Sequence, residues 1–169
     1  MDGYLLDTTA ASVLWDQKHH DHQMIRGFLQ GVAESPTWVS IVVLGEVTYG
    51  LKTAPQMDEN RQAEVRRKMA RFPSILDVNK HTIEPYSDLR AALFKKYSRK
   101  DTRGRLKTKW PEDLLDRTSA KELGVQENDL WIAAQAIQHN LILITSDHMR
   151  RLQEVSTELD YPLQLASWK

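Results

Sequence analysis

The sequence predicts an α/β domain with a mainly parallel central sheet. Short apolar runs alternate along the chain with longer segments whose apolar residues recur at helical spacing. The runs contain few polar residues, as expected for strands that helices cover on both faces. No repeat at a fixed period is evident.

The first half of the chain follows this alternation from its start. Tyr4–Leu6 is an apolar run that is followed by Asp7. Further along the chain, Ser40 is well placed to cap the helix expected at 42–50. Pro36 and Pro73 interrupt the pattern before later strands. The expected elements are a strand at 4–6, helices at 10–18 and 23–32, a strand at 38–40, helices at 42–50 and 59–71, and a strand at 75–76.

The second half contains one stretch that is difficult to assign. A helix is expected at 82–96, and the segment at about 97–123 is interpreted as an inserted basic segment with a helical piece after Pro111. The pattern then returns with a largely buried helix. Asn140 is expected to end this helix by adopting the left-handed backbone conformation. The remaining expected elements are a helix at 128–139, a strand at 141–144, a helix from about 149 and a strand at 163–165.

Length and composition narrow the class of protein. A chain of 169 residues is expected to form one domain, residues 1–169, with a substantial core. The absence of cysteine excludes disulfides, cysteine-based zinc sites and cysteine nucleophiles. No leader and no membrane-spanning apolar stretch is evident, so a cytoplasmic protein is expected. Because 23 basic and 23 acidic side chains balance, the distribution of charge matters more than its sum.

Four acidic residues occur at positions that are suited to binding a metal ion: Asp7, Glu46, Asp129 and Asp147. Asp7 and Asp147 each follow an apolar strand, and ligands of parallel sheets bind outside the carboxyl ends of the strands. Glu46 and Asp129 occur in mostly apolar helical stretches, where an unpaired carboxylate is costly to ionise. A divalent cation such as Mg²⁺ relieves that cost and takes carboxylate oxygens as ligands. We therefore predict a metal site, with Asp7, Asp129 and Asp147 as the best direct ligands.

Each acid also has a purely structural explanation. Asp7 can cap the first helix, and Asp129 can complement the dipole at the start of its own helix. Asp147 can be a turn residue, and Glu46 can be an exposed helical residue. The common position of Asp7 and Asp147 at strand ends is the strongest argument for a shared site.

Basic, histidine and aromatic residues supply further candidates. The basic block at 95–109 either contacts the phosphates of a nucleic acid, through Lys100, Arg103, Arg105 and Lys107, or is a solvated segment. The cations at 61–71 are interpreted as a solvated helix face. The histidines at 19–22 lack a defined metal-binding spacing and are interpreted as a surface loop or helix end. Three aromatic residues are interpreted as packing residues: Tyr49, Trp131 and Trp168.

Four sequence blocks resemble the PIN-domain nucleases, and among them the VapC-like toxins. These blocks are YLLDTT, SIVVLGEVTYG, NDLWIAAQAI and LILITSD, and they occur in the family's order over essentially the whole chain. The resemblance implies a three-layer α/β/α sandwich and hydrolysis of RNA phosphodiester bonds with Mg²⁺ or Mn²⁺. It also implies an antitoxin partner and a homodimer.

The resemblance assigns roles residue by residue. Asp7, Glu46, Asp129 and Asp147 match the family's four catalytic acids, and Thr145 matches a hydroxyl residue that supports the site. The family commonly has Asn two residues after the first acid. This chain has Thr9 there, whose hydroxyl can still form a hydrogen bond. The segment at 97–123 is longer than the family's usual connection, and it could bind RNA, cover the site or contact a partner.

Three alternative functions remain open at this point. The chain could be a stand-alone PIN nuclease without an antitoxin, or a non-catalytic module that binds RNA or protein on the same fold. A Mg²⁺-dependent phosphotransfer domain is the third alternative. A phosphatase of the haloacid-dehalogenase type would have Asp at the position of Thr9. A receiver domain would have an acid pair at the end of its first strand, which is missing here, and a phosphoacceptor Asp at the end of a later strand, for which Asp77 is the candidate.

Overall fold

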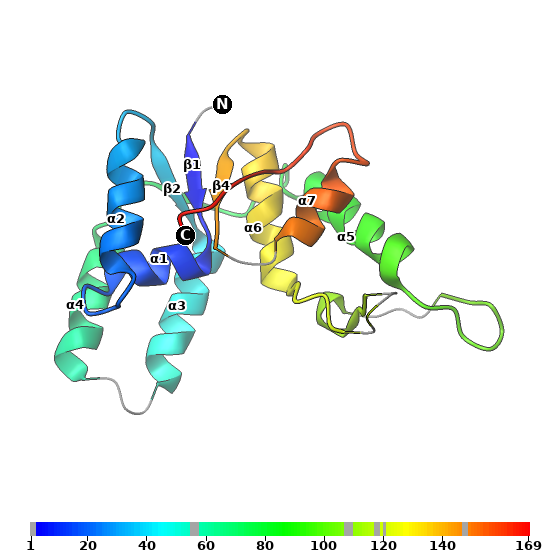
Figure 1. The fold of residues 1–169 in the computed structure, drawn as a ribbon, viewed down its shortest axis with the longest axis horizontal. Coiled ribbons are helices and arrows are strands. Elements are labelled where there is room, and N and C mark those ends of the chain that lie inside the picture. The colour runs from blue at the N-terminus through cyan, green and yellow to red at the C-terminus, as the bar shows by residue number, and fades with distance from the viewer. Residues whose placement is uncertain (1–2, 55–57, 107–109, 117–118, 120, 147–148) are drawn as a thin grey trace.

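The computed structural model describes residues 3–169 except 55–57, 107–109, 117–118, 120 and 147–148. Helices and short strands alternate along the chain (Figure 1). The elements in order are β1 (Tyr4–Leu6), α1 (Thr8–Trp15), α2 (His22–Gly31), β2 (Thr37–Ser40), α3 (Ile41–Thr53), α4 (Glu59–Ala70), β3 (Ile75–Leu76), α5 (Ile83–Tyr97), the 3₁₀ helix η1 (Pro111–Asp113), α6 (Glu127–Gln138), β4 (Ile142–Ile144), α7 (Arg150–Ser156) and β5 (Gln164–Ala166).

The five strands form one parallel sheet in the order β3-β2-β1-β4-β5. Leu6 on the central strand pairs with Val39 on one side and with Ile144 on the other. All three side chains are fully buried, which explains the uniformly apolar strand sequences. The predicted α/β class with a mainly parallel central sheet is confirmed, and in the described residues every strand pairing is parallel.

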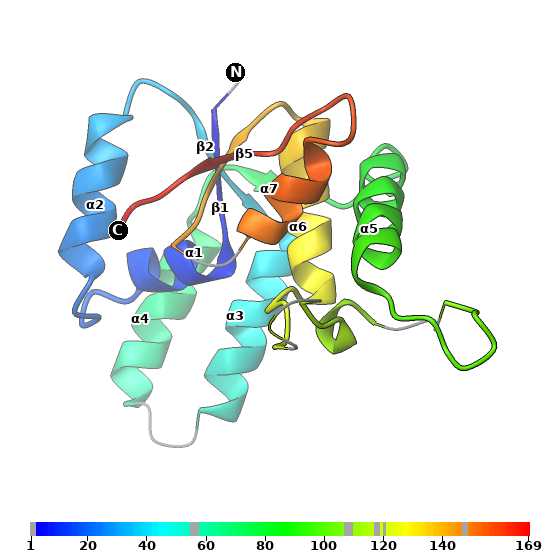
Figure 2. The ribbon, with the colours of Figure 1, turned by 45° about the vertical axis from the view of Figure 1, so that its right-hand side comes forward.

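Helices cover both faces of this sheet. The chain moves outward from β1 to β2 and β3, then returns across the sheet to β4 and β5. Because such crossovers are right-handed, the first four helices lie over one face and the last three over the other. Figures 1 and 2 agree: α2 and α4 lie to the left of the strands, and α5, α6 and α7 to the right. This is the predicted α/β/α sandwich.

Local capping sets several of the helix boundaries. The hydroxyl of Ser40 accepts a hydrogen bond from the backbone N of Val42 at 2.9 Å, as predicted for the start of α3. Asn140 has a φ of 52°, which confirms the left-handed stop after α6. The first helix differs from its predicted span at 10–18. It begins at Thr8 because Asp7 caps it, and it ends before Asp16, whose backbone is extended.

The connection between α5 and α6 also differs from the prediction. The expected helical piece at 112–121 is wrong: the 3₁₀ helix ends at Asp113, and Leu115 then forms an antiparallel bridge with Glu122. The carboxylate of Asp116 accepts a hydrogen bond from the backbone N of Ser119 at 2.8 Å, which favours a turn over a helix here.

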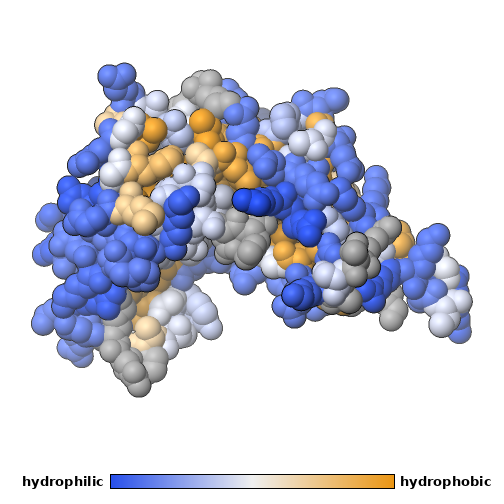
Figure 3. All heavy atoms as spheres, viewed as in Figure 1, coloured by the Kyte–Doolittle hydropathy of each residue, from blue (hydrophilic) through white to orange (hydrophobic). Residues whose placement is uncertain are grey.

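A short hairpin precedes this connection. Lys100 pairs with Leu106, and we refer to residues 99–106 as the basic arm. Figures 1 and 2 show that the arm projects away from the sheet, and it is mostly hydrophilic in Figure 3. No helix in the described part of the chain is long and apolar enough to cross a membrane.

Candidate active site

The candidate site lies at the carboxyl ends of the two central strands. Asp7 directly follows β1, and its backbone N donates to the carbonyl oxygen of Ile144 at 3.0 Å. Thr145 directly follows β4 and donates its backbone N to Ala166 on the next strand at 3.0 Å. Both residues are buried, with 2% of Asp7 and 4% of Thr145 exposed. The strand register thus places Asp7 and Thr145 side by side at one edge of the sheet, as the sequence predicts.

The carboxylate of Asp7 is oriented by the first turn of α1. Its Oδ1 accepts a hydrogen bond from the backbone N of Ala10 at 2.6 Å. The positive end of the helix dipole stabilises a carboxylate at this position. The capping role and the site role suggested by the sequence are therefore compatible, because the cap fixes the direction of the acid.

Glu46 connects this helix to a distant part of the chain. On α3, its Oε2 accepts a short hydrogen bond from the hydroxyl of Thr8, and its Oε1 accepts one from Nδ2 of Asn128 at 2.9 Å. Thr8 follows Asp7 and Asn128 precedes Asp129 in the sequence. The two hydrogen bonds therefore bring Glu46, Asp7 and Asp129 into one neighbourhood, although Glu46 lies 38 residues from Thr8 and 82 from Asn128.

Asp129 lies in the first turn of α6. Its Oδ2 accepts a hydrogen bond from the backbone N of Gln126 at 2.7 Å, which closes the start of the helix. The dipole interaction suggested by the sequence is present, and it again favours the charged carboxylate. Asp7 and Asp129 thus lie at helix N-termini, and Glu46 is held by Thr8 and Asn128. Carboxylate oxygens of this kind are the ligands that hard divalent cations prefer.

The other predicted site residues have different outcomes. Asp147 and Lys107 lie outside the described residues. Thr9 is exposed on the first turn of α1, and the hydroxyl that contacts Glu46 belongs to its neighbour Thr8. Lys100, Arg103 and Arg105 are exposed on the basic arm.

Sequence reasoning missed Thr8 and Asn128, the two residues that hold the Glu46 carboxylate. Their only signal was adjacency, since each lies directly beside a predicted acid. The interpretation of Trp131 and Trp168 as packing residues is confirmed: Trp131 stacks on Tyr86 with ring centroids 3.7 Å apart, and Trp168 is 3% exposed. The same interpretation is wrong for Tyr49, which is 70% exposed on α3.

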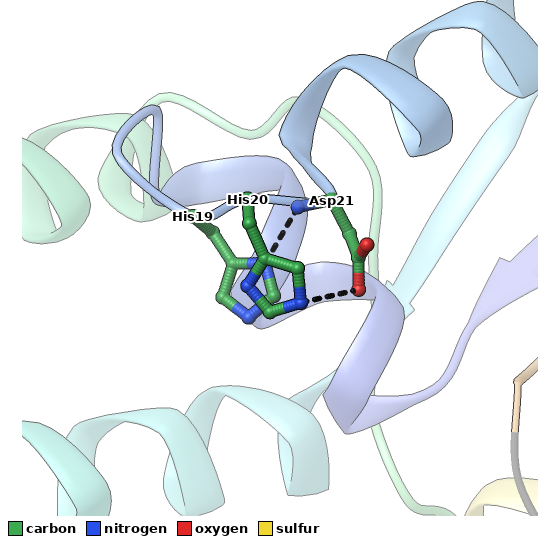
Figure 4. Close-up of side chains that lie close together, drawn as sticks. All are labelled: His19, His20 and Asp21. Carbon is green, nitrogen blue, oxygen red and sulfur yellow. Dashed lines mark hydrogen bonds and ion pairs between the residues drawn. The ribbon is translucent and has the colours of Figure 1, made fainter.

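A second group of potential ligands occurs at the start of α2, where His19, His20 and Asp21 lie close together (Figure 4). The carboxylate of Asp21 lies 2.8 Å from the ammonium of Lys169 and 3.2 Å from Nε2 of His20. Nδ1 of His19 accepts a hydrogen bond from the backbone N of Asp21. In the neutral ring this leaves the proton on Nε2, which then has no lone pair for a metal.

Lys169 thus supplies the cation of this group. Its ammonium lowers the pKa of the Asp21 carboxyl below the ordinary value, chiefly through their hydrogen bond. The group fastens the last residue of the chain to the start of α2. His19 and His20 lie in the turn before α2, in agreement with the interpretation of this stretch as a surface loop or helix end. His22 differs: it is buried at the start of α2, where its Nδ1 lies 3.0 Å from the carbonyl oxygen of Val13.

Comparisons with known proteins agree with this fold. Residues 4–156 match the model of a family described as "PIN domain". The structure of DNA-bound VapBC from Salmonella typhimurium is similar over 100% of both chains, with a TM-score of 0.66 and 17% identity. VapBC2 from Rickettsia felis, bound to a promoter DNA fragment, is similar over 98% of both chains, with a TM-score of 0.65 and 21% identity. No curated protein matches this chain.

Proposed function

Since the chain belongs to the PIN-domain family, we propose that it is a metal-dependent endoribonuclease, the toxin of a toxin–antitoxin pair. The observation that carries the proposal is the pair of hydrogen bonds that hold Glu46 between Thr8 and Asn128. These bonds join the Glu46 carboxylate on α3 to the residues next to Asp7 and Asp129 in the sequence. The proposal is that the acids share one divalent cation, which would relieve the repulsion between their negative charges.

Asp7, Asp129 and Asp147 would be the direct ligands of Mg²⁺ or Mn²⁺. When bound, the metal supplies Lewis acidity toward the scissile phosphate and a water of lowered pKa. The protein's part is orientation. The helix starts aim Asp7 and Asp129, while Thr8 and Asn128 hold the Glu46 carboxylate in one position. Thr145, beside Asp7, and Thr9 are the supporting hydroxyls of this proposal.

The RNA backbone would be held in part by the basic arm. Lys100, Arg103 and Arg105 are exposed on the arm, and Lys107 follows it in sequence. Cations at such positions bind phosphates and release counterions, so binding is expected to weaken with salt. The same proposal includes a cognate antitoxin and a homodimer. The antitoxin is supported by the VapBC complexes among the structural neighbours.

The decisive test compares RNA cleavage by the wild type, Asp7→Asn and Glu46→Gln, with Mg²⁺ and with EDTA. Asparagine caps a helix as well as aspartate does, so Asp7→Asn should fold normally. We expect EDTA and Asp7→Asn to abolish cleavage, and Glu46→Gln to lower it by roughly 10- to 100-fold, as for residues that orient metal ligands. Glu59→Gln, an exposed acid on α4, is the matched control. Undiminished cleavage by Asp7→Asn would falsify the assignment.

A second experiment tests the toxin role. Co-expression with the product of a small adjacent reading frame should give a stable complex whose nuclease activity is suppressed. A nuclease that is active in vitro but forms no such complex would be a stand-alone enzyme, which contradicts the toxin part of the proposal and leaves its chemistry intact.

A further inference from the structure

A cavity of about 330 Å³ lies between α5 and η1. It is lined by none of the candidate site acids Asp7, Glu46 and Asp129, which we call the carboxylate cluster. Tyr86, Arg90 and Phe94 line it from α5, and Pro111 and Leu114 line it from the η1 segment. Its volume is in the range of small-ligand pockets. Its walls combine aromatic and aliphatic surface with one guanidinium group, a composition suited to a flat, partly polar ring.

An aromatic stack with one exposed end adjoins this cavity. The guanidinium of Arg90 lies 5.8 Å from the centre of the Tyr86 ring and 5.1 Å from that of Trp110. Tyr86 in turn stacks on Trp131 with an interplanar angle of 6°. Trp110 is 62% exposed, a large apolar ring presented to solvent and positioned by a cation. Rings displayed in this way are stacking platforms for unpaired bases.

The stack is connected to the carboxylate cluster through the first turn of α6. Arg90 donates a hydrogen bond to Oε1 of Glu127 at 2.9 Å, and the hydroxyl of Tyr86 bonds to the same oxygen. Glu127 precedes Asn128, which holds Glu46. Within the described chain, Oε2 of Glu127 is buried and receives no hydrogen bond.

The positive charge of the neighbouring basic arm indicates what kind of molecule the cavity is suited to bind. Helix α5, which forms one wall, leads directly into the basic arm. Within the described residues, the four arm cations form no ion pair: Arg99, Lys100, Arg103 and Arg105. An occupant with flat aromatic rings on a polyanionic backbone fits both features, whereas an apolar peptide side chain would leave the arm without a counterpart.

From this geometry we propose that the cavity beside Trp110 is a base-binding subsite for single-stranded RNA. One base stacks on Trp110 next to Arg90, while flanking phosphates extend toward the basic arm. The proposal rests on the RNA substrate of the proposed function and adds the position at which an unpaired base is held. Figures 1 and 2 place the yellow-green η1 segment beside the lower end of α6, on the side toward the arm.

The test measures binding of a fluorescein-labelled, unstructured RNA of about 12 nucleotides to full-length Asp7→Asn protein in EDTA. We expect Trp110→Ala to weaken binding by roughly 5- to 100-fold, because stacking of one base is worth about 1–3 kcal/mol. Trp110→Phe should keep most of the affinity. Ala91→Phe, which adds a ring at the exposed cavity wall on α5, should weaken binding without removing the platform. Met24→Ala on α2 is the control, an exposed apolar residue over the opposite face of the sheet.

Two outcomes would overturn the subsite. One is unchanged affinity of Trp110→Ala and Ala91→Phe, which would favour an apolar protein side chain as the occupant. The other is an equal loss of affinity for an abasic ribose-phosphate chain of the same length, which has no base to stack. Failure of the nuclease proposal is distinguishable: RNA binding that depends on Trp110 but is not followed by cleavage supports the subsite and contradicts the enzyme.

Discussion

Helix α4 and the basic arm each carry four Lys or Arg side chains, but these cations have different surroundings. On α4, Arg61 forms two hydrogen bonds with the carboxylate of Asp16, one of them at 2.8 Å, and Lys68 lies 3.5 Å from Glu64. On the arm, the described cations project into solvent without acidic partners. The same number of cations therefore serves two different roles. Arg61 on α4 stabilises the fold, whereas the cations of the arm remain available to a polyanion.

The pair on α4 is a structural one because Asp16 is nearly buried. The Asp16 side chain is 11% exposed and the Arg61 side chain 32%. A carboxylate so shielded from water needs a partner, since leaving it unpaired costs far more than breaking an exposed ion pair. The following predictions test the contrast between α4 and the arm.

The largest expected effect on folding is that of Arg61→Ala. Removal of the guanidinium leaves the Asp16 carboxylate without its main partner, so the free energy of unfolding should fall by about 2–3 kcal/mol. Urea denaturation measures it. Arg66→Ala, an exposed residue on the same helix, should stay within about 0.5 kcal/mol of the wild type. Weakened RNA binding by Arg61→Ala at a temperature where it is fully folded would contradict the assigned role.

Reversal of charge on the arm should affect binding and not folding. For Arg103→Glu/Arg105→Glu we expect roughly tenfold weaker RNA binding, and a slope of log affinity against log salt reduced by about 1.4, since each phosphate contact on a single strand contributes about 0.7. Fluorescence anisotropy at several salt concentrations measures both quantities. The matched control is Arg66→Glu/Arg67→Glu on α4. If both pairs of substitutions weaken binding equally, the arm has no special role.

The sequence predicted the elements that carry strong local signals. The strands at the sheet centre and the cap at Ser40 were recognisable because burial and capping leave fixed residue types at fixed positions. Asp7 and Asp129 were recognisable for the same reason. The hydrogen bonds from Thr8 and Asn128 to Glu46 were not, because they join residues far apart in the chain and depend on helix packing.

The two basic stretches show the same limit. The sequence did not indicate that Arg61 forms a hydrogen-bonded ion pair with Asp16, which lies 45 residues earlier. It also did not indicate that the arm cations form no ion pair among the described residues. The 62% exposure of Trp110 was likewise not predicted, because tertiary packing decides whether a tryptophan side chain is exposed. Pairing and exposure are tertiary properties, and charge counts alone do not report them.

The ion pair on α4 should also be visible as a pH effect. The hydrogen bond from Arg61 is the main cause that lowers the pKa of the Asp16 carboxyl in the folded protein. A carboxyl group with a lowered folded-state pKa adds stability that is complete above its unfolded pKa, about 3.9, and is lost as the pH falls through the folded value. The difference in unfolding free energy between wild type and Arg61→Ala should therefore be constant near neutral pH and shrink as the pH falls below about 4. A difference that grows on acidification would contradict this origin.

The smallest expected effect concerns the shape of the arm and not its charge. Oδ1 of Asp101 accepts hydrogen bonds from the backbone N of Arg103 at 2.8 Å and of Arg105 at 2.9 Å, which closes the turn that presents both cations. Asp101→Ala removes one negative charge, which favours RNA, and loosens the turn, which adds an entropic cost to binding.

The two consequences of Asp101→Ala can be separated. Asp101→Asn keeps an acceptor for the turn without the charge, so it should bind RNA slightly more tightly than the wild type. Asp101→Ala should bind about threefold more weakly than Asp101→Asn, with faster amide hydrogen exchange at Arg103 and Arg105. Equal affinity of the two variants would mean that the arm acts only through its charge. In that case the ordered turn contributes nothing to recognition, and the contrast with α4 reduces to whether a cation has an acidic partner.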